Sequence, residues 1–272
     1  PCHNPALRSI VVPTPVEAER MPNAPFRITE RDERLRVCAF GLEPARARAT
    51  VAVLGDSHAS HWRPALDVVA KARRWHGLSI TRTGCAFSLA TPDVVPRART
   101  HCNQWKRQVL DWFHHHPEVS TVVVAAHAGA GVVAPPDRDQ FAVKREGYAK
   151  AWRALPSSVR HIVVIRDTPR MRGTTLDCVQ ETMDDRGRVG SACSVPRRLA
   201  LQPDPQVAAA STAGSSRLRV VDLTRQLCDA RACPAVVGGA LAFKDPDHLT
   251  PVFAATLGPF LRRDIDRAMS AR

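Results

Sequence analysis

The feature that most constrains the fold is a regular alternation, from residue 50 onward, of short apolar runs with longer amphipathic segments. The short runs are typical of buried strands, and the longer segments repeat apolar residues at helical spacing. Strands that alternate with helices predict a parallel sheet covered on both faces. We therefore predict a three-layer α/β/α domain with a five-stranded parallel sheet. The predicted strands are residues 50–54, 78–82, 119–126, 161–165 and 218–223, and the predicted helices are residues 60–74, 105–115, 140–154 and 251–269.

Two stretches of the chain lack this periodicity. Residues 1–49 carry several prolines and many charges, and we interpret them as an irregular extension that wraps the domain formed by residues 50–272. Residues 169–202 are predicted to form a bridged insertion after the fourth strand. The chain begins with Pro1 rather than a leader segment, and no apolar run approaches the roughly 18 residues of a membrane helix. We expect a soluble piece of a longer precursor.

The chain has eight cysteines, an even number, and each could form a disulfide with the next one along the sequence. This favours four disulfides and an oxidising compartment. Metal ligation is the competing interpretation, but the chain has no C-x-x-C pair of the kind that zinc sites use. Eight cysteines allow about 105 pairings, so the order of pairing stays open. The predicted pairs are Cys2 with Cys38, Cys85 with Cys102, Cys178 with Cys193, and Cys228 with Cys233.

A formal net charge of +13 raises the question of a polyanionic partner. Only five of the 39 basic residues are lysines, and the arginines are spread along the whole chain. The charge therefore resembles a compositional bias, and we predict no nucleic-acid partner. A cell-wall polymer or a lipid headgroup surface remains compatible with it.

The first predicted strand runs directly into Gly55-Asp56-Ser57-His58-Ala59 and then into a helix. Ligands bind open parallel sheets at the carboxyl ends of their strands. A serine in this turn has backbone N–H groups of the helix N-terminus beside it, and these can stabilise an oxyanion. The alternative is that Asp56 or Ser57 only caps the helix.

A second polar segment, residues 244–250, precedes the last predicted helix. It contains Asp245 three residues before His248. In a short turn this carboxylate can hold one imidazole nitrogen while the other nitrogen faces Ser57, as a catalytic triad requires. Asp247, adjacent to His248, is the poorer candidate for that role.

Together the two segments resemble the SGNH hydrolase family, which has Gly-Asp-Ser after its first strand and Asp-x-x-His before its last helix. The Gly-Asp-Ser-His variant, the paired cysteines and the tail His-Leu-Thr look similar to the SGNH domain fused to membrane acyltransferase-3 proteins, which O-acylate bacterial surface glycans. The resemblance covers roughly residues 51–272 and implies a flavodoxin-like sheet. It also implies Ser57 as nucleophile with its N–H in the oxyanion hole, His248 as general base and Asp245 as the residue that orients it.

The family's other two blocks match less completely. Its second block supplies an oxyanion donor from a glycine after the second strand, and Gly84 is the matching position. Its third block supplies an asparagine after the third strand, where this chain has Ala126-His127-Ala128 and no asparagine. Either His127 stands in as a donor, or it is an ordinary polar residue at a strand end.

Other candidates lie close to Ser57. His58 and Trp62 are candidate substrate-binding residues, the tryptophan as a sugar-stacking platform; the alternatives are an exposed helix residue and a core residue. Residues 114–116 are consecutive histidines followed by Pro117, and we interpret them as a helix end rather than a metal site. We predict no metal and no cofactor.

These patterns lead to one functional expectation and two alternatives. We expect an extracytoplasmic, serine-dependent O-acyltransferase that moves an acyl group, acetyl by preference, to a hydroxyl of a cell-envelope carbohydrate. The resemblance implies a membrane acyltransferase domain in the same full-length chain, which would tether this domain to the membrane. The alternatives are a carbohydrate O-acetyl esterase and a catalytically silent glycan-binding module, the latter suggested by the missing asparagine.

Overall fold

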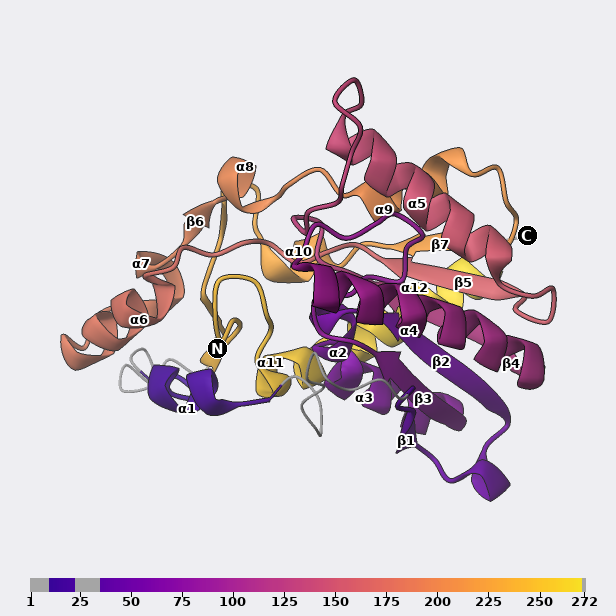
Figure 1. The fold of residues 1–272 in the computed structure, drawn as a ribbon. Helices are drawn as coiled ribbons and strands as arrows, with labels where there is room; N and C mark the ends of the chain where they lie inside the picture. The colour runs from indigo at the N-terminus through magenta and orange to yellow at the C-terminus, as the bar shows by residue number, and fades with distance from the viewer. Residues whose placement is uncertain (1–9, 23–34, 271–272) are drawn as a thin grey trace.

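The computed structural model describes residues 10–22 and 35–270, and within them a central sheet lies between two layers of helices (Figure 1). The sheet has the strand order β1-β3-β2-β4-β5-β7. All neighbours pair in parallel except β1, which pairs antiparallel with β3. The strands are β1 (Cys38–Gly41), β2 (Ala49–Gly55), β3 (Trp75–Thr81), β4 (Val119–Ala125), β5 (His161–Ile165) and β7 (Leu218–Val221).

The five parallel strands are those predicted from the apolar runs, and the α/β/α fold class is confirmed. The sixth strand, β1, was missed because it is only four residues long and is flanked by charged residues in a segment that was interpreted as irregular. Its Phe40 pairs with Gly77 of β3. A Cβ on Gly77 would lie 2.3 Å from the Phe40 ring, so the glycine makes room for this edge strand.

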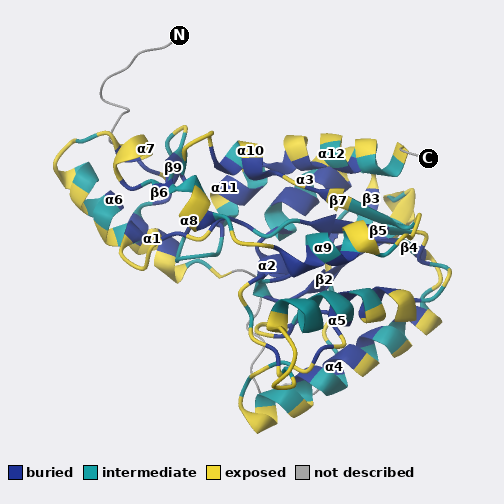
Figure 2. Cartoon of the chain, turned by 90° about the horizontal axis from the view of Figure 1, so that it is seen from above, coloured by how far each residue is buried: buried dark blue, intermediate teal, exposed yellow. Residues whose placement is uncertain are grey.

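Helices cover both faces of the sheet (Figure 2). Val51 and Val53 of β2 point to one apolar core and Ala52 and Leu54 to the other, as the two-residue period of a strand requires. On the first face lie α3 (Arg63–Arg73), α11 (Pro251–Thr256) and α12 (Gly258–Ser270), and on the second lie α4 (Pro96–His115), α5 (Gln140–Ala154) and α9 (Pro205–Thr212).

Two predicted helices differ from those observed. Helix α4 begins at Pro96, nine residues before the predicted start. The start was missed because the first turns are polar, with two arginines, a threonine and a histidine, and show little apolar periodicity. The helix predicted over residues 251–269 is two helices that meet at Leu257. Gly258 begins the second one, where a Cβ would lie 2.6 Å from that of Val68.

Residues 169–202, predicted to be an aperiodic insertion, contain regular elements. They contribute to a separate small core together with α1 of the N-terminal segment. Val12 lies against β10, because its N–H donates to Gly239 O over 2.9 Å and its carbonyl accepts from Leu241 N over 3.0 Å. The elements outside the central layers are α1 (Pro15–Arg20), η2 (Pro44–Arg46), α2 (Ser57–Ser60), α6 (Thr175–Asp184), α7 (Val189–Ala192), β6 (Val195–Pro196), α8 (Arg197–Ala200), α10 (Thr224–Leu227), β8 (Ala232–Cys233), β9 (Val236–Val237) and β10 (Ala240–Leu241).

Three of the four predicted disulfides are present: Cys85–Cys102, Cys178–Cys193 and Cys228–Cys233. Cys2 lies outside the described residues, and Cys38 forms no disulfide with a described one. The Cys2–Cys38 bridge therefore stays a prediction. No helix in the described part of the chain has both the length and the apolar character that a membrane span requires.

Candidate active site

The turn from β2 into α2 positions Ser57 at the carboxyl edge of the sheet. Gly55 has φ +145°, and a Cβ there would lie 1.8 Å from the carbonyl oxygen of Ala125 on β4. Asp56 caps α2 by accepting from His58 N over 2.8 Å, and its other oxygen accepts from His127 N over 3.0 Å. This buried carboxylate therefore joins the ends of β2 and β4 directly beside the serine.

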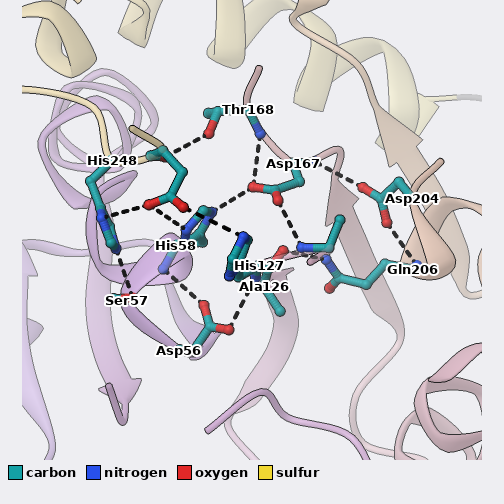
Figure 3. A network of polar contacts seen from close by, with 12 residues as sticks. Asp56, Ser57, His58, Ala126, His127, Asp167, Thr168, Asp204, Gln206 and His248 are labelled. Carbon is teal, nitrogen blue, oxygen red and sulfur yellow. Dashed lines mark hydrogen bonds and ion pairs between the residues drawn. The ribbon is translucent and has the colours of Figure 1, made fainter. Parts of the chain in front are cut away.

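The structure brings Ser57, His248 and Asp245 together in one hydrogen-bonded chain, and Figure 3 shows its Ser57–His248 contact. Ser57 Oγ lies 2.8 Å from His248 Nε2, and His248 Nδ1 lies 2.9 Å from both carboxylate oxygens of Asp245. The same carboxylate accepts the backbone N–H groups of Asp247 and His248, over 3.0 and 2.8 Å. The loop before α11 therefore holds the imidazole in the orientation that proton transfer from the serine needs.

A second carboxylate shares His248. Asp247 Oδ1 lies 3.1 Å from His248 Nδ1, although the sequence favoured Asp245 alone. Burial lowers the pKa of His248, but the hydrogen bonds to Asp245 and Asp247 outweigh burial and raise it above 6.5. The hydrogen bond to His248 and a second one to His58 hold the pKa of Asp247 far below its usual range. An imidazolium formed at His248 would thus face two carboxylates.

His58 lies behind the triad and not in it. Its Nδ1 lies 2.6 Å from Asp167 Oδ1, its Nε2 lies 3.7 Å from Asp247 Oδ1, and its ring stacks on His127 with centroids 4.5 Å apart. Burial disfavours the charged ring, yet the nearby Asp167 carboxylate raises the pKa of His58 to about 10. The buried imidazolium therefore balances the charge of Asp167 and Asp247.

A chain of hydrogen bonds continues from Asp167 to α9. Asp167 Oδ2 accepts from Ala128 N over 2.7 Å, and Asp167 N donates to Asp204 Oδ2 over 2.8 Å. Asp204 caps α9, whose Gln206 donates its side-chain N–H to Ala126 O over 3.2 Å. Sequence reasoning missed these residues. The available signal was position, because Asp167 follows the end of β5 at the same sheet edge as Ser57.

The geometry fits two of the three predicted oxyanion donors, Ser57 and Gly84, and does not fit His127. Gly84 has φ +66° and faces open space, since no atom lies within 4 Å of where its Cβ would be. Ser57 begins α2, so its N–H is among the unpaired donors of a helix start. The N–H of His127 already donates to Asp56, and its Nε2 faces Asp247 at 3.5 Å. His127 is therefore part of the polar cluster and a poor oxyanion donor.

The predicted substrate contacts of His58 and Trp62 do not fit the structure. Each residue is only 1% exposed, His58 within the polar cluster and Trp62 within the apolar core of the α3 face. The helix start faces inward because it packs across the end of the sheet. Sequence position beside Ser57 was therefore a poor guide to access.

Two sets of side chains have donor atoms close enough to hold a metal ion, within 4.8 Å of one another. They are His58 with His127 and Asp247, and Asp245 with Asp247 and His248. The same atoms form the hydrogen bonds and ion pairs described above. Their chemistry is accounted for by the triad and its charge balance, and we assign them no metal.

A cavity of about 480 Å³ borders the His248 loop at Leu249 and Pro251. His61 also lines it, with its ring centroid 5.9 Å from that of His248. Burial holds the pKa of His61 well below 6.5. The neutral ring of His61 therefore lies next to both this cavity and His248.

Comparison with known proteins identifies the family and the fold of this chain. The family model described as the SGNH domain fused to AT3 domains matches residues 23–263. The fold is similar to that of the periplasmic domain of the lipopolysaccharide acetyltransferase from Salmonella ser. Paratyphi A, with a TM-score of 0.59. The two are 11% identical, and the match covers 85% of this chain and 91% of that one. A search of curated proteins finds no match.

Proposed function

This chain belongs to the family of SGNH domains that are fused to AT3 domains, and from that premise we propose that it is an O-acyltransferase that works through an ester on Ser57. The acyl group, acetyl in the simplest case, is passed to a hydroxyl of a cell-envelope carbohydrate. The observation that carries the proposal is the chain from Ser57 Oγ through His248 to Asp245, with contacts of 2.8 and 2.9 Å.

The proposed first half-reaction loads the serine. Ser57 Oγ attacks the carbonyl carbon of the donor while His248 Nε2 takes its proton, and the N–H groups of Ser57 and Gly84 stabilise the resulting oxyanion. His248 then gives the proton to the leaving group as the bond to it breaks. The acyl group is left as an ester on Ser57.

The second half-reaction transfers the acyl group from Ser57 to the acceptor, with His248 again moving the proton. The acceptor hydroxyl attacks the ester carbonyl, His248 takes the hydroxyl proton, and the proton returns to Ser57 Oγ as the ester bond breaks. Asp245 and Asp247 stabilise the imidazolium in both halves. Water in place of the sugar hydroxyl would make the same site an esterase, which is the alternative function.

The three disulfides indicate an oxidising, extracytoplasmic setting for the domain. Because the family is fused to AT3 domains, we propose that a membrane acyltransferase domain of the full-length chain supplies the acyl group and tethers this domain.

The decisive experiment measures the fate of the acyl group. The domain is incubated with a chromogenic acetyl ester, with and without an oligosaccharide acceptor, and the products are separated. Acetylated oligosaccharide that depends on Ser57 supports the transferase. Free acetate alone, at a rate that the acceptor leaves unchanged, supports the esterase. A silent glycan-binding module, which the missing asparagine favours, would bind the oligosaccharide and release neither product.

A further inference from the structure

A second cavity, of about 180 Å³, lies beside the catalytic cluster on the α4 and α5 side of the sheet. Its polar lining includes Lys106 of α4, Lys144 and Tyr148 of α5, and Gly84, the candidate oxyanion donor. Alanine, proline and valine side chains form much of the rest. It is therefore a small, largely apolar space with two ammonium groups.

The walls of this cavity are held together by covalent and backbone bonds. The Cys85–Cys102 disulfide ties the loop after β3 to α4. The same loop pairs with the loop after β4, because Asp93 N donates to Gly131 O over 3.0 Å and Val133 N donates to Thr91 O over 2.9 Å. The cavity is therefore largely formed before any ligand enters.

The two lysines have neutral hydrogen-bond partners. Lys106, only 3% exposed, donates from Nζ to Ala90 O over 2.7 Å and, at the 3.5 Å limit, to Asn103 Oδ1. Lys144 Nζ donates to Ala128 O over 3.1 Å. No carboxylate of the described residues forms an ion pair with either lysine, and burial lowers the pKa of Lys106 to about 8. A buried cation without an ion-pair partner is costly, as Lys106 is, and the half-buried Lys144 lines the same cavity. Together the two lysines point to an anionic ligand.

The cavity is linked to the catalytic cluster through Ala128, which hydrogen-bonds Lys144 of the cavity lining and Asp167 of the cluster. Ala128, whose carbonyl accepts from Lys144, donates its N–H to Asp167 over 2.7 Å. Gly84 lines the cavity and follows β3 at the edge of the sheet that carries Ser57. A group held between the lysines would therefore lie close to the reacting part of a substrate.

We propose that this cavity binds a small carboxylate-bearing group of a substrate. The source is either the free end of a short dicarboxylic acyl chain or an acidic sugar of the acceptor. Two ammonium groups provide charge-assisted hydrogen bonds to the carboxylate, and the apolar lining holds the carbons next to it. The volume lies below the range of about 300–1,000 Å³ for sites of drug-sized ligands, which suits one short group. The assignment to a substrate rests on the proposed acyl transfer.

Calorimetric titration of the Ser57→Ala protein tests this without turnover, so a failed result is separate from failure of the proposed reaction. The probes are succinate, glucuronate and uncharged succinamide. We expect at least one carboxylate to bind, and Lys106→Met and Lys144→Met each to weaken it about tenfold or more. Lys150→Met, an exposed lysine of the same helix α5, is the matched control and should leave the Kd unchanged.

The pattern of probes identifies the source. Binding of succinate alone supports the acyl chain, and binding of glucuronate alone supports the acidic sugar. Binding of both supports the shared carboxylate chemistry. Binding of neither, equal binding of succinamide, or equal effects of all three lysine variants overturns the proposal. Because methionine keeps length and removes a buried charge, melting curves should show both cavity variants folded.

Discussion

At the scale of single residues, the site is organised by the carboxylates around two histidines. Asp245 and Asp247 both face His248, and Asp167 and Asp247 both face His58. His58 lowers the pKa of His248 by charge repulsion, while the two carboxylates raise it. The proton-accepting power of His248 is therefore set by the whole cluster.

Replacing Asp245 tests this balance in the triad. His248 must be neutral to accept a proton, so ester hydrolysis should fall on the acid side of a pKa above 6.5. In Asp245→Asn the loss of the negative charge beside His248 should move this acid limb to lower pH and reduce kcat by about 10²-fold. That is less than the roughly 10⁴-fold of a triad that loses its only carboxylate, because Asp247 remains. A pH profile identical to that of the wild type would contradict the assigned role.

The His58–Asp167 pair should appear in the pH dependence of stability. The pKa of His58 is about 10 in the folded protein against 6.5 for a free histidine, so the folded state binds the extra proton between these values. The stabilisation is complete below about pH 6.5 and is lost as pH rises toward 10. Asp167→Asn should remove it, so the difference in melting temperature between wild type and variant should shrink across this range. The lowered pKa of Lys106 makes stability rise with pH above about pH 8. This contribution is the same in the wild type and in Asp167→Asn, so it cancels in the difference.

Part of this residue-level picture could be predicted from sequence. Two short motifs at the ends of the domain contain Ser57, Asp245 and His248. The spacing of residues within these motifs was enough to predict the three side chains. The partner of His58 is 109 residues away, and only the ends of β2 and β5 at a common sheet edge bring the two together. Local spacing therefore placed His58 beside substrate, where the structure has it buried.

At the scale of secondary-structure elements, the turn between β2 and α2 is the most constrained. Gly55→Ala would place a methyl group 1.8 Å from Ala125 O at a φ that side chains rarely adopt. We expect a loss of at least about 2 kcal/mol in the free energy of unfolding, from strain and forced separation of the strands. Gly173→Ala, where nothing lies within 4 Å, is the control and should change it by less than about 0.5 kcal/mol. Urea denaturation gives both values, and equal stabilities would refute this account of the turn.

The elements that sequence reasoning found are those with a strong apolar period. The parallel strands are buried on both faces and read as unbroken apolar runs. The first turns of α4 were missed because they lie in polar sequence. Strand β1 was missed because it is short and is ordered by tertiary contacts, such as that of Phe40 with Gly77. Propensity alone carries little information at such positions.

At the scale of the whole molecule, disulfides connect segments that the sheet does not. Cys85–Cys102 spans 17 residues and ties the loop after β3 to α4, whereas Cys228–Cys233 spans only 5. Loop-closure entropy predicts stabilisation of about 3 kcal/mol for the first and about 2 kcal/mol for the second. Paired Cys→Ser variants, unfolded in urea under oxidising conditions, should lose stability in that order. A larger loss of stability on removal of Cys228–Cys233 would show that native contacts, and not loop length, determine how much each disulfide stabilises the protein.

We propose that Ser57 and His248 perform the chemistry, and the first test is the hydrolysis of a chromogenic acetyl ester. The wild type is compared with Ser57→Ala and His248→Ala and with Ser211→Ala, an exposed serine of α9 that lies outside the site. We expect a loss of about 10³-fold or more in kcat in both site variants and none in Ser211→Ala. Turnover by Ser57→Ala at the rate of the wild type would contradict it.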